Sequence, residues 1–168
     1  MKTNIFKKLN GKGLKVAIVQ ARFNREITDG LTKGALEALK GAGVAAKDIK
    51  IFQVPGSFEI PLTCQKIIKA KKFDGILAIG AIIKGETPHF DFIAKAATEG
   101  IMRVMLEYDF PITFGVITTY NLEQAKARAK NNKDNKGYEA ALALVEIIKN
   151  FKEISRRDKS LIESRLAG

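Results

Sequence analysis

The chain of 168 residues contains one cysteine, Cys64, and one histidine, His89. A single cysteine excludes an internal disulfide framework. Metal sites commonly use histidine nitrogen and cysteine sulfur as ligands, so having one of each argues against a metal centre. We therefore expect no metal site, and we expect Cys64, which lies among apolar residues, to belong to the core.

Long hydrophobic runs are also missing. No apolar stretch reaches the roughly 18 residues that a membrane-spanning helix requires. The N-terminal segment MKTNIFKKLNGKGLK is positively charged, but the apolar segment of a secretory signal does not follow it. Internal repeats and low-complexity segments are absent as well. We expect one soluble, cytoplasmic domain with no membrane partner.

Acidic residues are comparatively few, because 29 Lys and Arg oppose 18 Asp and Glu, which gives a formal net charge of +11. Basic chains often bind nucleic acids or phosphorylated ligands. Here the basic residues are dispersed and are not interleaved with aromatic residues, so we expect no specific nucleic-acid partner. The Asn-rich segment 126–136 differs, since Arg128 or Lys136 could bind a phosphate there or remain a surface cation.

Strand-like and helix-like segments alternate along the chain. Apolar or alternating runs predict strands at 14–21, 48–54, 75–83 and 111–119. Apolar residues at helical spacing predict helices between and after them: one containing Ile27, Leu31, Ala35, Ala38 and Leu39, one with Leu62, Ile67 and Ile68 inward, one from Ile93 to Tyr108, one at 121–130 and one from about Tyr138. Single helices between strands imply right-handed parallel crossovers, and hence an α/β fold with a four-stranded parallel sheet covered on both faces.

The domain organisation follows from this pattern. We expect an N-terminal arm at 1–13, one domain at 14–151, and a polar C-terminal tail at 152–168 that either continues the last helix or frays. In open α/β sheets, ligands bind beyond the carboxyl ends of the strands. This rule selects four connections as candidate ligand sites, namely 22–24, 54–59, 84–89 and 118–121.

The connection KGETPH contains the only histidine. Thr87 suits a helix N-cap and Pro88 the first helical position, so the amides of Gly85, Glu86 and Thr87 would face outward and attract an anion such as phosphate. His89 then lies in the first turn of the helix. Imidazole takes and gives protons near neutral pH, but position alone leaves a capping or packing histidine equally open.

Two other connections carry unusual residues. In VPGSFE, the segment from Ser57 to Glu59 begins the second helix. Glu59 could accept hydrogen bonds from ligand hydroxyl groups, or it could simply stabilise the first helical turn. Phe23, which follows the first strand, could stack on a flat ligand or cover the edge of the sheet.

Six segments in this order resemble the 6,7-dimethyl-8-ribityllumazine synthase family, over nearly the whole chain from about 14 to 151. They are RFN (22–24), VPGSFEIP (54–61), GAIIKGETPHFDFI (80–93), PITFGVITT (111–119), LEQAKARA (122–129) and NKGYEAA (135–141). The resemblance implies a flavodoxin-like three-layer α/β/α sandwich. It also implies an enzyme of riboflavin biosynthesis that condenses 5-amino-6-(D-ribitylamino)uracil with 3,4-dihydroxy-2-butanone 4-phosphate, releasing phosphate and water without cofactor or metal.

The same resemblance implies roles for individual residues. His89 would be the catalytic proton shuttle. The pyrimidine and ribityl groups would contact Phe23, Ser57, Phe58, Glu59, Ala81, Ile82, Ile83, Phe114 and Lys136. The phosphate would contact Gly85, Glu86, Thr87 and Arg128. Phe114, Arg128 and Lys136 would come from a neighbouring subunit.

The family also implies an assembly, which is a homopentamer and in many bacteria an icosahedral capsid of twelve pentamers, with riboflavin synthase as a candidate cargo. Two features depart from the family pattern. Tyr120 stands where members often have an acid after the Thr-Thr pair, and the segment KNNKDN (130–135) lacks the usual glycines. The length of that segment matches capsid-forming members, which favours a capsid.

Two other functions stay open at this point. A flavin or lumazine carrier on the same scaffold would bind the heterocycle without turnover, although it would not need a phosphate site. A basic structural shell that binds nucleic acid is suggested only by the net charge of +11, and steeply salt-dependent RNA retention would indicate it.

Overall fold

The computed structural model describes residues 9–166 of the chain, with side chains as far as Arg157. The elements, in chain order, are β1 (Val16–Ala21), α1 (Arg25–Gly41), the 3-10 turn η2 (Ala46–Asp48), β2 (Ile49–Val54), the 3-10 turn η3 (Ser57–Glu59), α2 (Ile60–Lys69), β3 (Gly75–Ile83), α3 (His89–Glu107), β4 (Ile112–Thr119), α4 (Leu122–Arg128) and α5 (Lys136–Leu166). All four predicted strands are present, within two residues of their predicted bounds.

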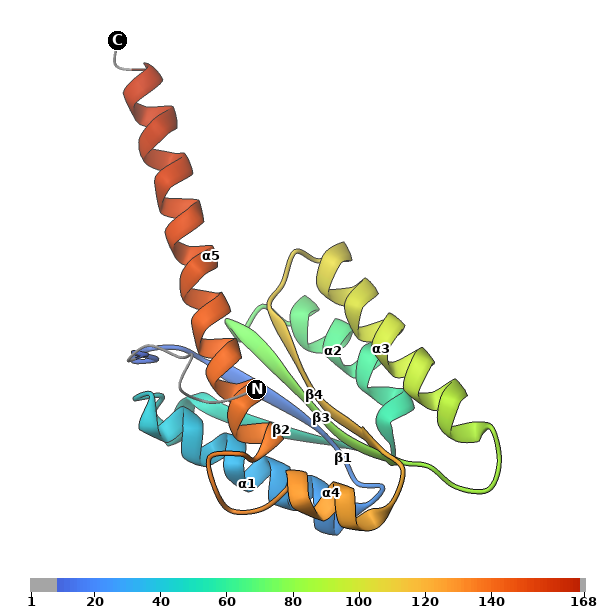
Figure 1. The fold of residues 1–168 in the computed structure, drawn as a ribbon. Coiled ribbons are helices and arrows are strands. Elements are labelled where there is room, and N and C mark those ends of the chain that lie inside the picture. The colour runs from blue at the N-terminus through green and yellow to red at the C-terminus, as the bar shows by residue number, and fades with distance from the viewer. Residues whose placement is uncertain (1–8, 167–168) are drawn as a thin grey trace.

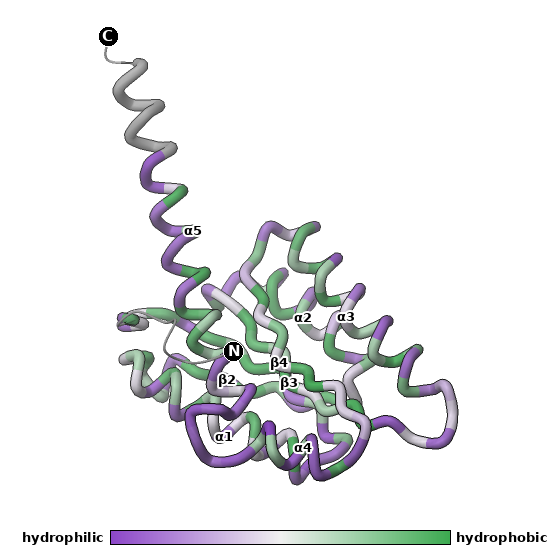
Figure 2. The backbone as a smooth tube through the Cα atoms, viewed as in Figure 1, coloured by the Kyte–Doolittle hydropathy of each residue, from purple (hydrophilic) through white to green (hydrophobic). Residues whose placement is uncertain are grey.

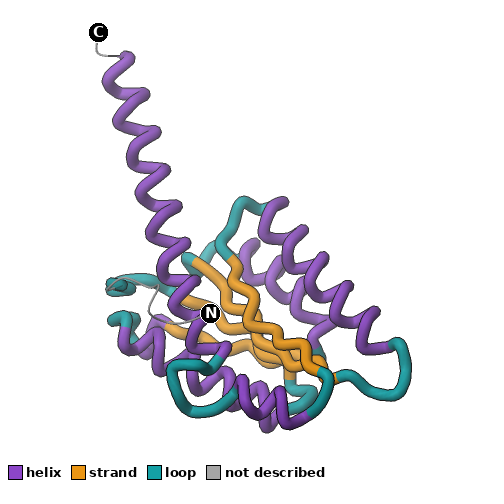
Figure 3. Tube along the Cα trace, viewed as in Figure 1, coloured by secondary structure: helices purple, strands orange, loops and turns teal. Residues whose placement is uncertain are grey.

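The four strands form one parallel sheet in the order β2-β1-β3-β4. Helices α1, α4 and α5 cover one face, and α2 and α3 cover the other (Figures 1 and 3). This arrangement confirms the predicted flavodoxin-like three-layer sandwich, whose strand order reverses direction between β1 and β3.

Each face of the sheet has its own core, because side chains alternate along a strand. In β1, Val16 and Ile18 pack with α1 and α5, whereas Ala17 and Val19 pack with α2 and α3. Burial of both faces explains why β1 and β3 are almost continuously hydrophobic, as the green colour of β3 in Figure 2 shows. The edge strand β2 instead alternates between apolar and polar residues. Fully burying one isoleucine such as Ile18 contributes about 1.5–3 kcal/mol.

Helix α2 contains the predicted core cysteine and one wrong prediction. Cys64 is fully buried, and that burial raises the pKa of its thiol to about 12. Leu62, predicted to face inward, is 61% exposed. Because successive helical residues are about 100° apart, a helix that buries Ile60, Cys64 and Ile67 turns Leu62 to its opposite side.

The last helix begins at Lys136, two residues before the predicted start, and continues to Leu166. The tail at 152–168 therefore prolongs this helix, with residues 167–168 outside the described residues. Its outer part projects away from the sheet and is mainly hydrophilic as far as it is coloured (Figures 1 and 2). Lys152 Nζ donates to Asp74 Oδ1 at 2.8 Å, which ties this part of α5 to the domain. Of the predicted arm at 1–13, residues 1–8 lie outside the described residues.

Candidate active site

The carboxyl ends of the strands open a crevice between β1 and β3. Pairing of β1 with β3 ends at Gln20–Ile79, whereas β3 continues alongside β4 to Ile83–Thr119. The chain leaves β1 toward β2 and leaves β3 toward β4, which makes this gap the switch point where ligands of such sheets bind. The predicted ligand edge is thus present, and three of its four connections line this crevice, whereas residues 118–121 do not.

A cavity of about 570 Å³ occupies this crevice. It brings together most of the predicted site: Phe23, Ser57, Phe58, Glu59, Ala81, Ile82, Ile83, Gly85, Thr87 and His89. Pro55 and Gly56, which belong to the predicted connection 54–59, also line it, as do Phe90 and Ile93, which were not predicted. Phe90 could have been suspected from its place directly after His89, but Ile93 follows the helical core pattern and gave no separate signal.

The β2–α2 connection forms the wall beside β1. Ser57–Glu59 is a 3-10 turn that precedes α2, rather than the first turn of α2 as predicted. The Gly56 N–H donates to Glu59 Oε2 at 2.8 Å, which holds the carboxylate back over the turn. Phe58 remains 60% exposed. The turn therefore offers a carboxylate and an aromatic face beside the cavity.

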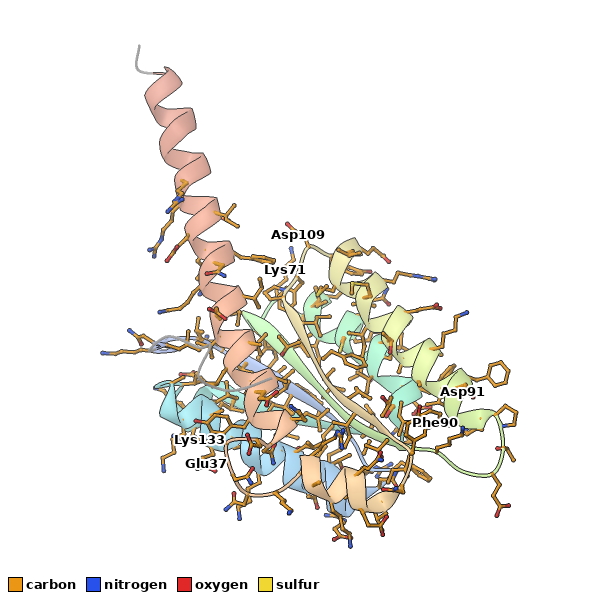
Figure 4. All side chains as sticks on the ribbon, in the orientation of Figure 1. Glu37, Lys71, Phe90, Asp91, Asp109 and Lys133 are labelled. Atoms are coloured by element: carbon orange, nitrogen blue, oxygen red, sulfur yellow. The ribbon has the colours of Figure 1, made fainter. Side chains whose placement is uncertain are left out.

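The β3–α3 connection forms the opposite wall, near Phe90 and Asp91 in Figure 4. Here the cap prediction is wrong by one residue: Pro88 occupies the N-cap position, His89 is the first helical residue, and no side chain caps the helix. Proline adopts the required φ of −63° readily, and its missing N–H costs nothing at this position. His89 is exposed, which removes the alternative of a core packing residue.

Glu86 does not line this cavity, although its neighbours Gly85 and Thr87 do. On the other side of the connection, Lys84 donates its N–H to the Thr119 carbonyl at 2.8 Å. The Lys84 ammonium lies 5.6 Å from the ring centroid of Tyr120, the residue that replaces the expected acid. Tyr120 thus presents its aromatic face to Lys84, whereas an acid at the same position would form an ion pair with that lysine.

Three predicted residues lie in a second hollow of about 500 Å³, which β4, α4 and α5 line. Phe114, Arg128 and Lys136 all line it, and none of them lines the cavity that contains His89. Glu139, a residue that was not predicted, lines it too and is only 8% exposed. One chain therefore presents the two halves of the predicted site on separate surfaces.

The cations of this second hollow are held by local bonds. Both Glu139 carboxylate oxygens accept from Lys136 Nζ at 2.9 Å, and this hydrogen bond is the main cause that raises the pKa of Lys136. Arg128 Nη1 donates to the Gln124 carbonyl at 2.9 Å in the same helix. The hollow is therefore a cationic surface with an aromatic ring, Phe114, that is 43% exposed.

The described residues contain no group of three or more His, Cys, Asp and Glu side chains that could hold a metal ion. Within the same residues, no helix is both long and apolar enough to cross a membrane. The His89 cavity offers an exposed aromatic ring, a carboxylate, strand-end backbone groups and one imidazole. Such a set can bind a flat, hydroxylated heterocycle and move protons on it.

Comparison with known proteins agrees with this geometry. A family model described as 6,7-dimethyl-8-ribityllumazine synthase matches residues 13–152. A protein of that name from Desulfovibrio desulfuricans is 46% identical over 146 residues, which cover 87% of this chain and 94% of the relative. Relatives of the same name from Nautilia profundicola and Lactiplantibacillus plantarum are 46% and 47% identical, over 83% and 90% of this chain and over 91% and 95% of their own lengths.

Proposed function

This chain belongs to the 6,7-dimethyl-8-ribityllumazine synthase family, and from that premise we propose how its residues divide the reaction. The enzyme is a transferase of riboflavin biosynthesis. It condenses 5-amino-6-(D-ribitylamino)uracil with 3,4-dihydroxy-2-butanone 4-phosphate and releases phosphate and water. These bond changes require proton transfers and no net electron transfer, so the proposed reaction needs no redox cofactor.

The pyrimidine binds in the crevice between β1 and β3. Its ring stacks on Phe23, whose side chain is 70% exposed and is therefore not packed into the core. The backbone of residues 81–83 lies beyond the last β1 pair. Its Ala81 carbonyl accepts from Asn24, and the remaining backbone groups on the β1 side bond the edge of the ring. Ser57, Phe58 and Glu59 hold the ribityl chain. The observation that supports this arrangement is that all of these groups line one cavity with His89.

The phosphate of the second substrate binds beside the start of α3. Gly85, Glu86 and Thr87 supply backbone N–H groups there, and the helix dipole favours an anion at this end. Arg128 adds a charge-assisted bond from a neighbouring subunit. The phosphate would thus be held where it must leave as an anion.

His89 transfers the protons. Forming an imine from the amine of the pyrimidine and the ketone of the second substrate requires a proton that converts the carbinol hydroxyl into water. Eliminating phosphate requires removal of a proton from carbon while the leaving anion is stabilised. One imidazole next to the phosphate site serves both steps, and holding the two substrates together supplies much of the remaining rate enhancement.

The site is completed by a second copy of the chain. Phe114, Arg128 and Lys136 line a separate hollow in one chain, so they reach the substrates only if that hollow faces the His89 cavity of a neighbour. A head-to-tail contact of this kind forms a ring when its rotation closes. We propose a homopentamer, and a capsid of twelve pentamers with riboflavin synthase as cargo, on the family pattern and the length of segment 130–135.

The experiment that tests this function follows the fluorescence of the lumazine formed from both substrates. His89→Ala is expected to lower kcat by about 10²-fold or more while substrate affinity stays within a few-fold. Glu99→Gln, on the same helix and paired with exposed Lys95, is the control and should keep full activity. Full activity of the His89 variant would refute the proton-shuttle role, and tight heterocycle binding without any turnover in the unmodified chain would indicate a carrier.

A further inference from the structure

Asn24 has a backbone conformation that its position does not require. Three non-glycine residues among those described have positive φ: Asn24 at 56°, Lys71 at 53° and Asp109 at 46°. Lys71 and Asp109 follow the ends of α2 and α3, where a left-handed residue commonly terminates a helix. Asn24 instead precedes α1, where the N-cap residue is normally extended. Figure 4 shows Lys71 and Asp109 at the opposite edge of the sheet from Phe90.

The side chain of Asn24 is also used unusually. An N-cap asparagine ordinarily accepts a hydrogen bond from the helix that it precedes, but Asn24 makes no such bond with α1. Its Nδ2 donates to the Ala81 carbonyl on β3 at 2.8 Å. The β1–β3 ladder has already ended at Gln20–Ile79. The side-chain amide of Asn24 therefore bonds a β3 carbonyl that lies beyond the reach of the β1 backbone ladder.

The turn around Asn24 is therefore fixed to two strands at once. On the other side, Arg22 and Phe23 donate their N–H groups to the carbonyls of Val54 and Pro55, at 2.8 and 3.0 Å. The left-handed residue reverses the chain directly after Phe23 and leaves its ring 70% exposed beside the cavity. The bond to Ala81 fixes the β3 backbone on the facing wall of the same cavity.

We propose that Asn24 is a positioning residue for the pyrimidine substrate. It sets the spacing between the aromatic face of Phe23 and the backbone edge at residues 81–83, so that a flat heterocycle fits between them. This inference rests on the proposed function, since it takes the ring to lie on Phe23. A purely structural role would tie β1 to β3 and would affect both substrates alike or only the stability.

The main variant is Asn24→Gly, because glycine keeps the positive φ without strain while removing the amide. We expect the KM for the pyrimidine to rise about tenfold, the loss of one well-aligned hydrogen bond, and the KM for the butanone phosphate to stay within about twofold. Asn24→Asp keeps the shape but cannot donate when ionised, and it should impair pyrimidine binding at least as much. Asp109→Gly, the same backbone relaxation at the opposite edge, should leave both KM values unchanged.

A double-mutant cycle with Phe23→Ala shows whether Asn24 acts through that ring. If it does, Asn24→Gly will raise the pyrimidine KM much less in the Phe23→Ala background than in the unmodified enzyme. A folded Asn24→Gly enzyme with an unchanged pyrimidine KM, an equal rise in both KM values, or full additivity in the cycle would overturn the inference. An unchanged pyrimidine KM for Phe23→Ala alone would instead refute the proposed ring placement, and that result needs no Asn24 variant.

Discussion

At the scale of single residues, Asn135 shows how one buried amide determines the shape of a surface. It is fully buried, and its Nδ2 donates to the carbonyls of Gly30 and Lys130 at 3.0 and 2.9 Å. Its Oδ1 accepts from the N–H groups of Gly137 and Tyr138 at 2.8 and 3.1 Å. Each donor and acceptor of the amide is thus bonded, which holds the α4–α5 connection against α1.

We predict that Asn135→Ala destabilises the protein by about 3 kcal/mol, because a fully buried amide is removed and two carbonyls and two N–H groups lose their partner. Asn132→Ala is the matched control. Asn132 lies exposed in the same connection and its side chain accepts one bond, from the Asp134 N–H, so its loss should cost at most about 0.5 kcal/mol. Urea unfolding at equal protein concentration measures both, and equal stabilities of the two variants would contradict the prediction.

The residue types in the sequence predicted the chemical groups of the site better than they predicted how those groups are arranged. Phe23, Ser57 and His89 were predicted from their places after strands, and the cavity joins them. The bond between Asn24 and Ala81 was not predictable, because it joins residues that are 57 positions apart. Glu139 was not predicted as a site residue either. A glutamate near the start of a helix is normally interpreted as an acid that stabilises the helix dipole.

At the scale of elements, β3 and the η3 turn pack together through one glycine. A Cβ at Gly80 would overlap the hydroxyl of Ser57, which is 6% exposed. The absence of a side chain on β3 therefore lets the turn lie close to the sheet and shapes one wall of the His89 cavity. At the other end of the same strand, a Cβ at Gly75 would meet Ile148 at 2.7 Å and Leu144 at 2.9 Å.

Substituting each of these two glycines distinguishes an effect on the shape of the site from an effect on core packing. We predict that Gly80→Ala displaces the Ser57 turn and raises the pyrimidine KM several-fold, because the change acts on the cavity wall. Gly75→Ala should instead lower stability by about 1–3 kcal/mol through overpacking against α5, with KM unchanged. Steady-state kinetics and thermal unfolding of both variants test this, and a Gly75→Ala enzyme with the larger KM change would refute it.

The elements themselves were largely predictable, because their apolar periodicity is strong. Strand β3 was predicted with its observed bounds, and the core face of α1 was predicted correctly. Predictions failed where the periodicity was ambiguous, as at Leu62 in the ten-residue helix α2, or where a boundary depends on local backbone geometry, as at Pro88. Residue pattern alone could not show that Arg128 and His89 lie in different hollows, since that depends on how β4 packs between α4 and α5. Only the family resemblance implied it.

At the scale of the whole molecule, the outer part of α5 lies beyond the matched family region, which ends at residue 152. The side chains of residues 151–157 are all exposed. We predict that a chain ending at Lys152 keeps its thermal midpoint and activity, because the Lys152–Asp74 ion pair and the buried turns are retained. A chain ending at Ile147 is the contrast: it loses Ile148, which is 1% exposed, and should melt at a clearly lower temperature.

The separation of the two hollows leads to a prediction about the assembled enzyme. If each active site combines His89 of one subunit with Arg128 of the next, the variants His89→Ala and Arg128→Ala are each inactive in pure form for different reasons. A mixed ring contains interfaces at which an Arg128→Ala subunit supplies an intact His89 cavity and a His89→Ala subunit supplies an intact Arg128. Random assembly of equal amounts should then restore activity at about one quarter of the sites.

Co-unfolding and refolding the two variants together, followed by the lumazine assay, measures this recovery. Mixing them without unfolding is the control and should stay inactive if subunits do not exchange. A refolded mixture of His89→Ala with the double variant His89→Ala/Arg128→Ala must also stay inactive, since no subunit then carries the imidazole. Full assembly without any recovery in the first mixture would mean that His89 and Arg128 do not meet across an interface, and Arg128 would then be a surface cation, the alternative that the sequence left open.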